Sequence, residues 1–340
     1  KDLLSLEKIK SRVLQARNEH GHVQGIIHLA PLANLELPQN IEDWKISTQV
    51  QIKSLFQLLQ ICANDLQGDE SRMGRVLAAS YLGGYFGRYN RLGQGLPVGG
   101  GCQGLLKTLY LEWPRVYPKA IDMGSNLSPE QMASIITREA ALPLGEVEVG
   151  YPEGERTIFR VVSAPFESQK EKPEQQQGLE SQGADQADWV VLVTGGARGV
   201  TSLVTKSFIK PGMRVVIAGR STLDTEKLAE VAEFNTPVEL REHFLEQNKT
   251  HKLSKTPAQI EAEVKNILKE REIRDNIAEL QKTGAQVEYK ALDVRDEQAF
   301  GQLIEDIYAE HGRLDAVVHG AGFIADKLIT EKDMQSFDRV

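Results

Sequence analysis

Glycines that follow a short apolar run in the second half of the chain have the spacing of a phosphate-binding turn. The run Trp189–Val193 predicts a strand, and the residues after it are Thr194, Gly195, Gly196, Ala197, Arg198, Gly199 and Val200. Glycines let the backbone turn tightly and approach a pyrophosphate without a Cβ clash. The helix expected next would direct free N–H groups and the positive end of its dipole at the phosphates. The run therefore predicts a strand, a phosphate-binding turn and a helix.

A second predicted strand, Arg214–Ala218, ends in Gly219, Arg220 and Ser221. In a dinucleotide-binding unit this position faces the adenosine ribose, where an acidic residue binds the 2′-hydroxyl of NAD and a basic residue pairs with the 2′-phosphate of NADP. The planar guanidinium of Arg220 suits a phosphate, and Ser221 adds a hydroxyl donor. NADPH is therefore the expected cofactor. The alternative is an arginine that faces solvent in a loop.

Small residues end another predicted strand, Leu314–His319, which continues into Gly320, Ala321 and Gly322. Without bulky side chains, this strand end allows a cofactor to lie flat against the backbone. His319 has no charged partner in the nearby sequence, and we expect a structural role for it.

These runs resemble the short-chain dehydrogenase/reductase superfamily, and more narrowly the ketoreductase domain of type I polyketide and polyunsaturated fatty-acid synthases. The narrow resemblance rests on Thr194–Thr201, Gly219–Ser221, Val317–Gly322, Lys327-Leu328 and Ser336–Val340. The chain departs from the superfamily at Thr201, where a glycine is usual. The resemblance implies an α/β fold with a Rossmann-type doubly wound parallel sheet.

The resemblance also assigns a place to Asp293 and Val294, which follow the predicted strand Gln286–Leu292. In the superfamily an aspartate at this position closes the adenine pocket through its carboxylate. The alternative is that Asp293 serves only the turn before a helix that opens near Asp296. Both roles are compatible.

The first half of the chain resembles the structural subdomain of a split ketoreductase, a truncated Rossmann-like unit without a cofactor. Gly25–Ala30 parallels Ala316–Ala321, and Arg75–Ser80 predicts a strand that ends in a serine. No phenol occupies the expected place of the catalytic tyrosine, Gly95–Cys102. We expect packing and strand-end hydrogen bonds for Ser80 and His28. Tyr85 and Tyr89 lie near Ser80 in sequence, but the half lacks a phosphate loop and we expect no catalysis from them.

Three segments follow from composition and resemblance: the structural subdomain at 1–165, a flexible linker at 166–187, and the NADPH-binding subdomain at 188–340. The linker is rich in Gln, Glu and Lys and cannot bury a core. A helical insert at 222–284 separates the second and third strands of the NADPH-binding subdomain. Its last predicted helix, Pro257–Thr283, has an apolar stripe that favours core packing, and its charged face favours solvent over a docking surface.

The composition of the chain argues against several classes of partner. The net charge of −8 argues against nucleic acid, and no apolar run reaches the length of a membrane span. The two cysteines have no metal-binding spacing, so we expect no metal and a reduced, cytoplasmic setting.

The resemblance implies hydride transfer from NADPH to a β-ketoacyl thioester on an acyl carrier protein, within a protein that carries neighbouring synthase domains. The superfamily uses a tyrosine acid with a lysine and a serine. From the spacing of His28 and Ser80, the catalytic serine is expected near position ~370. We therefore assign no catalytic residue in this chain and expect it to lack the catalytic Ser/Tyr segment. The alternative is a non-catalytic NADP-binding or structural module that organises neighbouring synthase domains.

Overall fold

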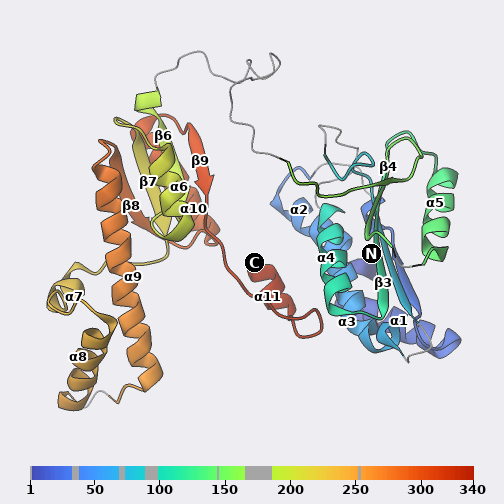
Figure 1. Cartoon of the computed structure of the whole chain (residues 1–340), viewed down its shortest axis with the longest axis horizontal. Coiled ribbons are helices and arrows are strands. Elements are labelled where there is room, and N and C mark those ends of the chain that lie inside the picture. Colours follow the sequence, from blue (N-terminus) through green and yellow to red (C-terminus); the bar gives the residue numbers. More distant parts are fainter. Residues whose placement is uncertain are drawn as a thin grey trace. The chain divides into compact units, whose positions relative to one another are not determined.

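The computed structural model describes residues 2–32, 38–68, 73–88, 99–143, 145–164, 186–251 and 254–340. The chain divides into two compact units (Figure 1). The first unit comprises Lys1–Phe166 together with Ala325–Arg339, and the second comprises Glu167–Ile324 with Val340. The predicted linker, 166–187, lies outside the described residues except for its last two.

The first unit is built around a mixed sheet. Its elements are α1 (Leu6–His20), β1 (Gly25–His28), α2 (Ile41–Thr48), α3 (Ser54–Gln67), β2 (Gly74–Ser80), α4 (Gly100–Glu112), β3 (Val116–Met123), α5 (Pro129–Ala141), β4 (Glu148–Tyr151) and β5 (Thr157–Ile158). Among the described residues the strand order is β1-β2-β3-β4-β5, with β1 to β4 parallel and β5 antiparallel to β4. A π-helical turn, Gln49–Lys53, joins α2 to α3.

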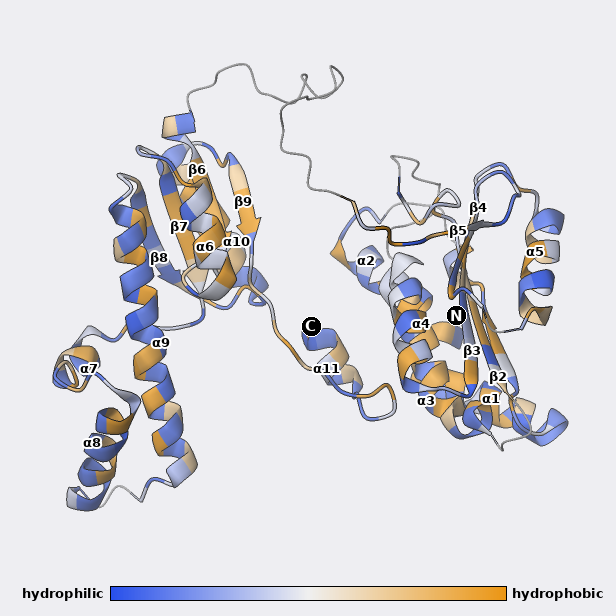
Figure 2. Cartoon of the chain, in the orientation of Figure 1, coloured by the Kyte–Doolittle hydropathy of each residue, from blue (hydrophilic) through white to orange (hydrophobic). Residues whose placement is uncertain are grey.

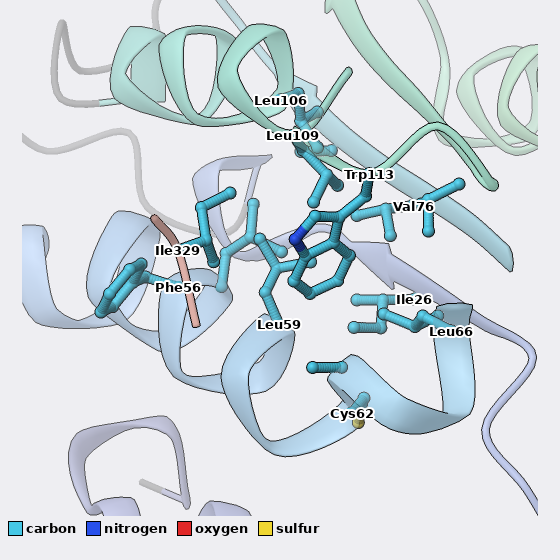
Figure 3. Packing of buried hydrophobic residues seen from close by; sticks show 14 of the residues in the cluster. Ile26, Phe56, Leu59, Cys62, Leu66, Val76, Leu106, Leu109, Trp113 and Ile329 are labelled. Atoms are coloured by element: carbon cyan, nitrogen blue, oxygen red, sulfur yellow. The ribbon is translucent and has the colours of Figure 1, made fainter. Parts of the chain in front are cut away.

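Apolar side chains of α3 and α4 pack together over the sheet (Figure 3). Leu59 of α3 and Leu109 of α4 are fully buried, and Trp113 at the end of α4 is 3% exposed. Removal of this apolar surface from water is the main source of stability in the first unit. The two helices thus fix where β2 and its terminal Ser80 lie.

The second unit has a parallel sheet. Its elements are β6 (Val190–Thr194), α6 (Gly199–Phe208), β7 (Arg214–Gly219), α7 (Thr225–Glu230), α8 (Pro237–Thr250), α9 (Pro257–Gln281), β8 (Gln286–Ala291), α10 (Glu297–His311) and β9 (Ala316–His319). Within the described residues the strand order is β8-β7-β6-β9. The predicted strands are present, with ends shifted by a few residues, and the predicted helical insert contains α7, α8 and α9.

Alternate residues of β6 and β7, which are largely hydrophobic in Figure 2, point to opposite faces. Val191 and Val193 pack with Ile273 and Leu280 of α9 on one face, whereas Leu192 packs with side chains of α10 on the other. Helices therefore cover both faces, which confirms the doubly wound α/β fold.

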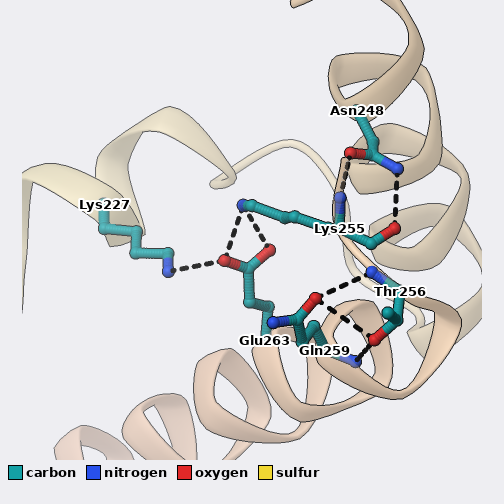
Figure 4. Close-up of polar contacts among 6 residues, drawn as sticks. All are labelled: Lys227, Asn248, Lys255, Thr256, Gln259 and Glu263. Atoms are coloured by element: carbon teal, nitrogen blue, oxygen red, sulfur yellow. Dashed lines mark hydrogen bonds and ion pairs between the residues drawn. The ribbon is translucent and has the colours of Figure 1, made fainter. Parts of the chain in front are cut away.

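The apolar stripe of α9 is core packing, as the sequence predicts, and it serves two cores. The carboxyl-terminal half of α9 covers the sheet, while Ile260, Val264 and Ile267 pack against α7 and α8. Thr256 and Gln259 form a capping box at the start of α9. Lys255 reaches Glu263 at 2.7 Å, and Lys227 of α7 lies 3.9 Å from the same carboxylate (Figure 4). The insert is thus a small helical core attached to the sheet through one long helix.

The segment Ala325–Arg339, which ends in α11 (Met334–Arg339), packs with the first unit. Gln60 of α3 donates to the carbonyl oxygens of Ile329 and Lys332 at 2.8 and 2.6 Å, and Glu112 of α4 accepts from the Ile329 N–H at 2.8 Å. Ile329 is 3% exposed and joins the α3–α4 core (Figure 3). The sequence places this segment with 188–340. The structure differs because Ile329 buries its side chain against α3 and α4.

Candidate functional site: the carboxyl edge of the second sheet

The glycine turn after β6 requires its glycines. Gly195 has φ +70°, and a Cβ there would lie 2.9 Å from the backbone of Ala321. A Cβ at Gly196 would collide with the side chain of Val193. Gly199, with φ +57°, opens α6 and has no atom within 4 Å of its Cβ position. The turn therefore leads directly into the first turn of a helix, where backbone N–H groups without a partner inside the helix can bind an anion.

The end of β9 lies beside this turn. The Gly320 N–H donates to the carbonyl oxygen of Thr194 at 2.9 Å, and the Ala321 N–H donates to the hydroxyl oxygen of Thr194 at 3.3 Å. His319 Nδ1 lies 2.7 Å from the same hydroxyl, a bond between neighbouring strand ends that agrees with a structural role. A Cβ at Gly320 would collide with Thr201, so this glycine makes room for the residue that departs from the superfamily.

The end of β7 carries Gly219, Arg220 and Ser221 at the same edge of the sheet. Tyr289 of β8 donates from its hydroxyl to the Ser221 carbonyl oxygen at 2.9 Å, and a Cβ at Gly219 would lie 2.7 Å from that hydroxyl. The side chain of Arg220 is exposed. Tyr289 thus fixes the backbone on either side of Arg220 and leaves its guanidinium at the surface.

Asp293, after β8, serves a turn. Its carboxylate accepts from the Arg295 backbone N–H at 3.0 Å and from the Arg295 guanidinium at 2.6 Å. These hydrogen bonds, the guanidinium bond first, hold the pKa of Asp293 well below its usual range. Asp296, and not Asp293, caps α10. A contact of Asp293 or of Val294 with adenine stays a prediction.

Two residues of α9 belong to this site although the sequence interpretation left them in a solvated face. Glu272 accepts from Arg198 Nε at 2.7 Å and from the Gly199 N–H at 3.3 Å. Burial lowers the pKa of Lys269, and the positive charges of Arg198 and Arg220 lower it further. Three cations from three separate elements therefore share one region. The signal in the sequence was their spacing: Lys269, Glu272 and Asn276 recur at three and four residues along one helix face.

The corresponding strand ends of the first unit carry a closed hydrogen-bond network. Ser80 donates to the Asp122 carboxylate at 2.7 Å, and that carboxylate also accepts from the Leu82 and Phe86 N–H groups. His28 Nε2 lies 2.9 Å from the Gln51 carbonyl oxygen. Packing and strand-end bonding account for Ser80 and His28, as expected.

The sequence also raised a tyrosine near Ser80, metal ligands and membrane spans. Tyr89 and the first half of Gly95–Cys102, residues 95–98, lie outside the described residues. Over the described ranges, no group of His, Cys, Asp and Glu has a geometry that could hold a metal ion. In the same part of the chain, no helix combines the length and apolar character needed to cross a membrane.

Comparison with known proteins agrees with this geometry. A family model described as the KR domain matches residues 190–340, which include the glycine turn, Arg220 and all strands of the second sheet. Residues 190–340 belong to the ketoreductase domain family.

Two curated relatives of this ketoreductase domain are much longer proteins. A polyunsaturated fatty acid synthase protein of Thraustochytrium sp. is 27% identical over 254 residues, which is 71% of this chain and 9% of that protein. The polyketide synthase PksL of Bacillus subtilis is 27% identical over 223 residues, 65% of this chain and 4% of its own length. The chain therefore spans less than a tenth of these relatives.

Solved structures show the fold for the whole chain. An N-terminal ketoreductase from the macrolactin assembly line matches 99% of this chain and 55% of its own, with TM-score 0.62 and 17% identity. A structure of A-type ketoreductases from a modular polyketide synthase matches 98% and 57%, with TM-score 0.59 and 18% identity. Both units therefore have the fold of these solved ketoreductases. The first half of the chain lies before residue 190, where the match to the KR family model begins.

Proposed function

We propose that the chain is the cofactor-binding part of a ketoreductase that uses NADPH to reduce β-ketoacyl thioesters held on an acyl carrier protein. One observation carries the proposal: the glycine turn of β6 and Arg220 of β7 lie at the same edge of a parallel sheet within the KR match. Ligands of open parallel sheets bind at that edge. As in the sequence prediction, the expected cofactor-binding residues are Thr194–Val200, Gly219–Ser221, Asp293-Val294 and Gly320–Gly322.

Each part of the edge has a task toward the nucleotide. The N–H groups that open α6 face the pyrophosphate, and the small residues Gly320–Gly322 leave room beside β9 for a flat ring. Arg220 pairs with the 2′-phosphate, with Arg198 beside it. When bound, NADPH supplies the hydride that reduces a carbonyl carbon. The protein's part is to hold the nucleotide against the strand ends.

The same reasoning extends to partners. The curated relatives are synthase proteins with many times the length of this chain, so the proposed context is a multidomain synthase in the cytoplasm. The substrate would then arrive on an acyl carrier protein. A second candidate is a module that binds NADP without catalysis and organises neighbouring domains. The first unit fits a structural part in either case, since its strand ends carry a closed network of Ser80, Asp122 and backbone groups.

Arg220→Ala tests the cofactor assignment. Loss of a charge-assisted bond to the 2′-phosphate should weaken NADPH binding by about tenfold or more and leave NADH binding within about twofold. Isothermal titration of both nucleotides measures the two dissociation constants. Arg214→Ala is the matched control, because Arg214 begins the same strand at the opposite edge of the sheet. Equal losses for NADPH and NADH would refute the role of Arg220.

A turnover assay tests whether this chain carries out the reduction by itself. The chain is incubated with NADPH and a simple β-ketoacyl thioester, and absorbance of the reduced nicotinamide is followed. Oxidation of NADPH with formation of the β-hydroxyacyl product identifies a working ketoreductase. Binding without oxidation is the result expected if the catalytic Ser/Tyr segment is not part of this chain, and it fits a truncated ketoreductase as well as a non-catalytic module.

A further inference from the structure

A carboxylate of the helical insert occupies the place where a phosphate is expected. Glu272 of α9 binds Arg198 at 2.7 Å through one oxygen and the Gly199 N–H at 3.3 Å through the other. Asn276, one turn further along α9, donates to the Ala197 carbonyl oxygen at 2.9 Å. The phosphate turn is therefore tied to α9 at consecutive residues, and its arginine already has an anionic partner.

The same helix face also carries a cation. Lys269 lies three residues before Glu272, so both side chains leave α9 on one side. Lys269 is partly buried, and the positive charges of Arg198 and Arg220 lower its pKa. Bringing a third cation toward two arginines is unfavourable by itself, and a bound dianion would relieve the repulsion. The arrangement suits a phosphate group that several cations share.

We propose that Lys269 and Glu272, on one face of α9, together set how strongly this chain prefers a nucleotide with a 2′-phosphate. Lys269 adds a cation for that phosphate. Glu272 opposes binding, because it holds the Arg198 guanidinium until the phosphate takes its place. The inference rests on the proposed cofactor site and adds residues from an insert to its specificity.

Exchange of one anion for another at Arg198 is physically feasible. The side chains of Arg198 and Glu272 are 44% and 41% exposed, so water replaces the broken contacts. A dianionic phosphate offers the guanidinium more charge and more acceptor oxygens than one carboxylate. Glu272 therefore lowers the affinity for NADPH without closing the site.

A purely structural tie is the competing explanation, and α9 provides its control. Glu279 of α9 binds Lys206 of α6 at 3.0 Å, an ion pair between the same two helices but two turns further from the phosphate turn. If Glu272 only fastens α9 to α6, Glu272→Gln and Glu279→Gln should behave alike. Lys265, exposed and one turn before Lys269, gives the matched control Lys265→Gln.

The experiment measures dissociation constants of NADPH, NADH and adenosine 2′,5′-bisphosphate for the full chain and four variants. Glu272→Gln should tighten NADPH and the bisphosphate by about two- to fivefold, the range expected when an exposed ion pair is removed as a competitor. Lys269→Gln should weaken both ligands by about fivefold or more. NADH affinity should change less than twofold in Lys269→Gln. In Glu272→Gln it should change by a smaller factor than NADPH affinity, because the Gly199 N–H that Glu272 also holds faces the pyrophosphate of both nucleotides. Glu279→Gln and Lys265→Gln should leave all three ligands unchanged.

The possible failures are distinguishable. If the nucleotides bind but Glu272→Gln and Lys269→Gln leave the NADPH-to-NADH ratio unchanged, the inference about α9 is wrong and the cofactor site stands. If no variant binds NADPH, NADH or the bisphosphate, both the cofactor site and the inference are refuted.

Discussion

Glu139 of α5 is the centre of a buried charge network in the first unit, and replacing its carboxylate should lower the free energy of unfolding of that unit. Its side chain has no exposed surface, and its carboxylate accepts from Lys119 at 2.9 Å, from Arg156 at 2.7 Å and from the Tyr151 hydroxyl. Lys119 is itself only 8% exposed. Loss of one partner leaves the other charge buried without compensation, which typically costs about 3–5 kcal/mol.

The contribution of this network to the stability of the first unit should depend on pH in the acid range. Burial of Glu139 disfavours its charged form, but hydrogen bonds from Arg156, Tyr151 and Lys119 outweigh that effect and lower its pKa from 4.5 to about 2. This shift corresponds to roughly 3 kcal/mol of stability at neutral pH. Because the folded-state pKa is the lower one, the contribution is present above pH 4.5 and is lost as the pH falls toward about 2.

Glu139→Gln should therefore lower the free energy of unfolding of the first unit by about 3 kcal/mol at pH 7 and by progressively less as the pH falls from 4.5 toward 2. Urea unfolding followed by tryptophan fluorescence measures this in a Trp189→Phe background, where Trp44 and Trp113 both report on the first unit. Glu42→Gln, which breaks the exposed pair with Lys45, is the control. The reasoning fails if both variants lose equally little, or if the loss in Glu139→Gln does not depend on pH in that range.

Further substitutions test the packing of the segment Ala325–Arg339 and the contact between Gly320 and Thr201. Ile329→Ala should lower the free energy of unfolding of the first unit by about 2–4 kcal/mol, measured by the same urea unfolding. Leu328→Ala, at a position 51% exposed, should change this free energy little. Equal effects of the two substitutions would contradict the packing of Ala325–Arg339 on the first unit. Gly320→Ala should destabilise the second unit by about 1–3 kcal/mol through its clash with Thr201, and Thr201→Gly should recover part of that loss. Additive losses in the double variant, measured by thermal unfolding, would contradict that contact.

The second unit could be predicted from sequence because its signals are local. Each apolar strand is followed within three residues by glycine or a polar residue, and α9 has a capping box and a regular apolar stripe. The edge that carries Arg220 follows from these strands, since parallel strands end at a common edge.

The first unit could be predicted only in part. The sequence interpretation proposed no strand at β3, which contains Pro118, Lys119 and Asp122 although most of it is buried. These residues are tolerated there because Glu139 neutralises Lys119 and because Ser80 and backbone N–H groups satisfy Asp122. Such partners are distant in sequence. The last strand of this unit, β5, spans only Thr157–Ile158, too short to carry a clear sequence pattern.

Long-range contacts also explain the residues that the candidate site gained. Glu272 lies 74 residues from Arg198, and only the packing of α9 on the sheet brings them together. The tail is a similar case, because Ile329 follows Gln60 by 269 residues. A charged helix face or a short tail cannot be assigned a partner from local pattern alone.

Titration of the chain with NADPH and with NADH tests whether the carboxyl edge of the second sheet is an NADPH site. We expect saturable binding of NADPH, at least about tenfold tighter than that of NADH, because Arg198, Arg220 and Lys269 recognise the 2′-phosphate. Absence of NADPH binding, or equal affinity for the two nucleotides, would contradict the assignment of the second sheet's carboxyl edge as an NADPH site.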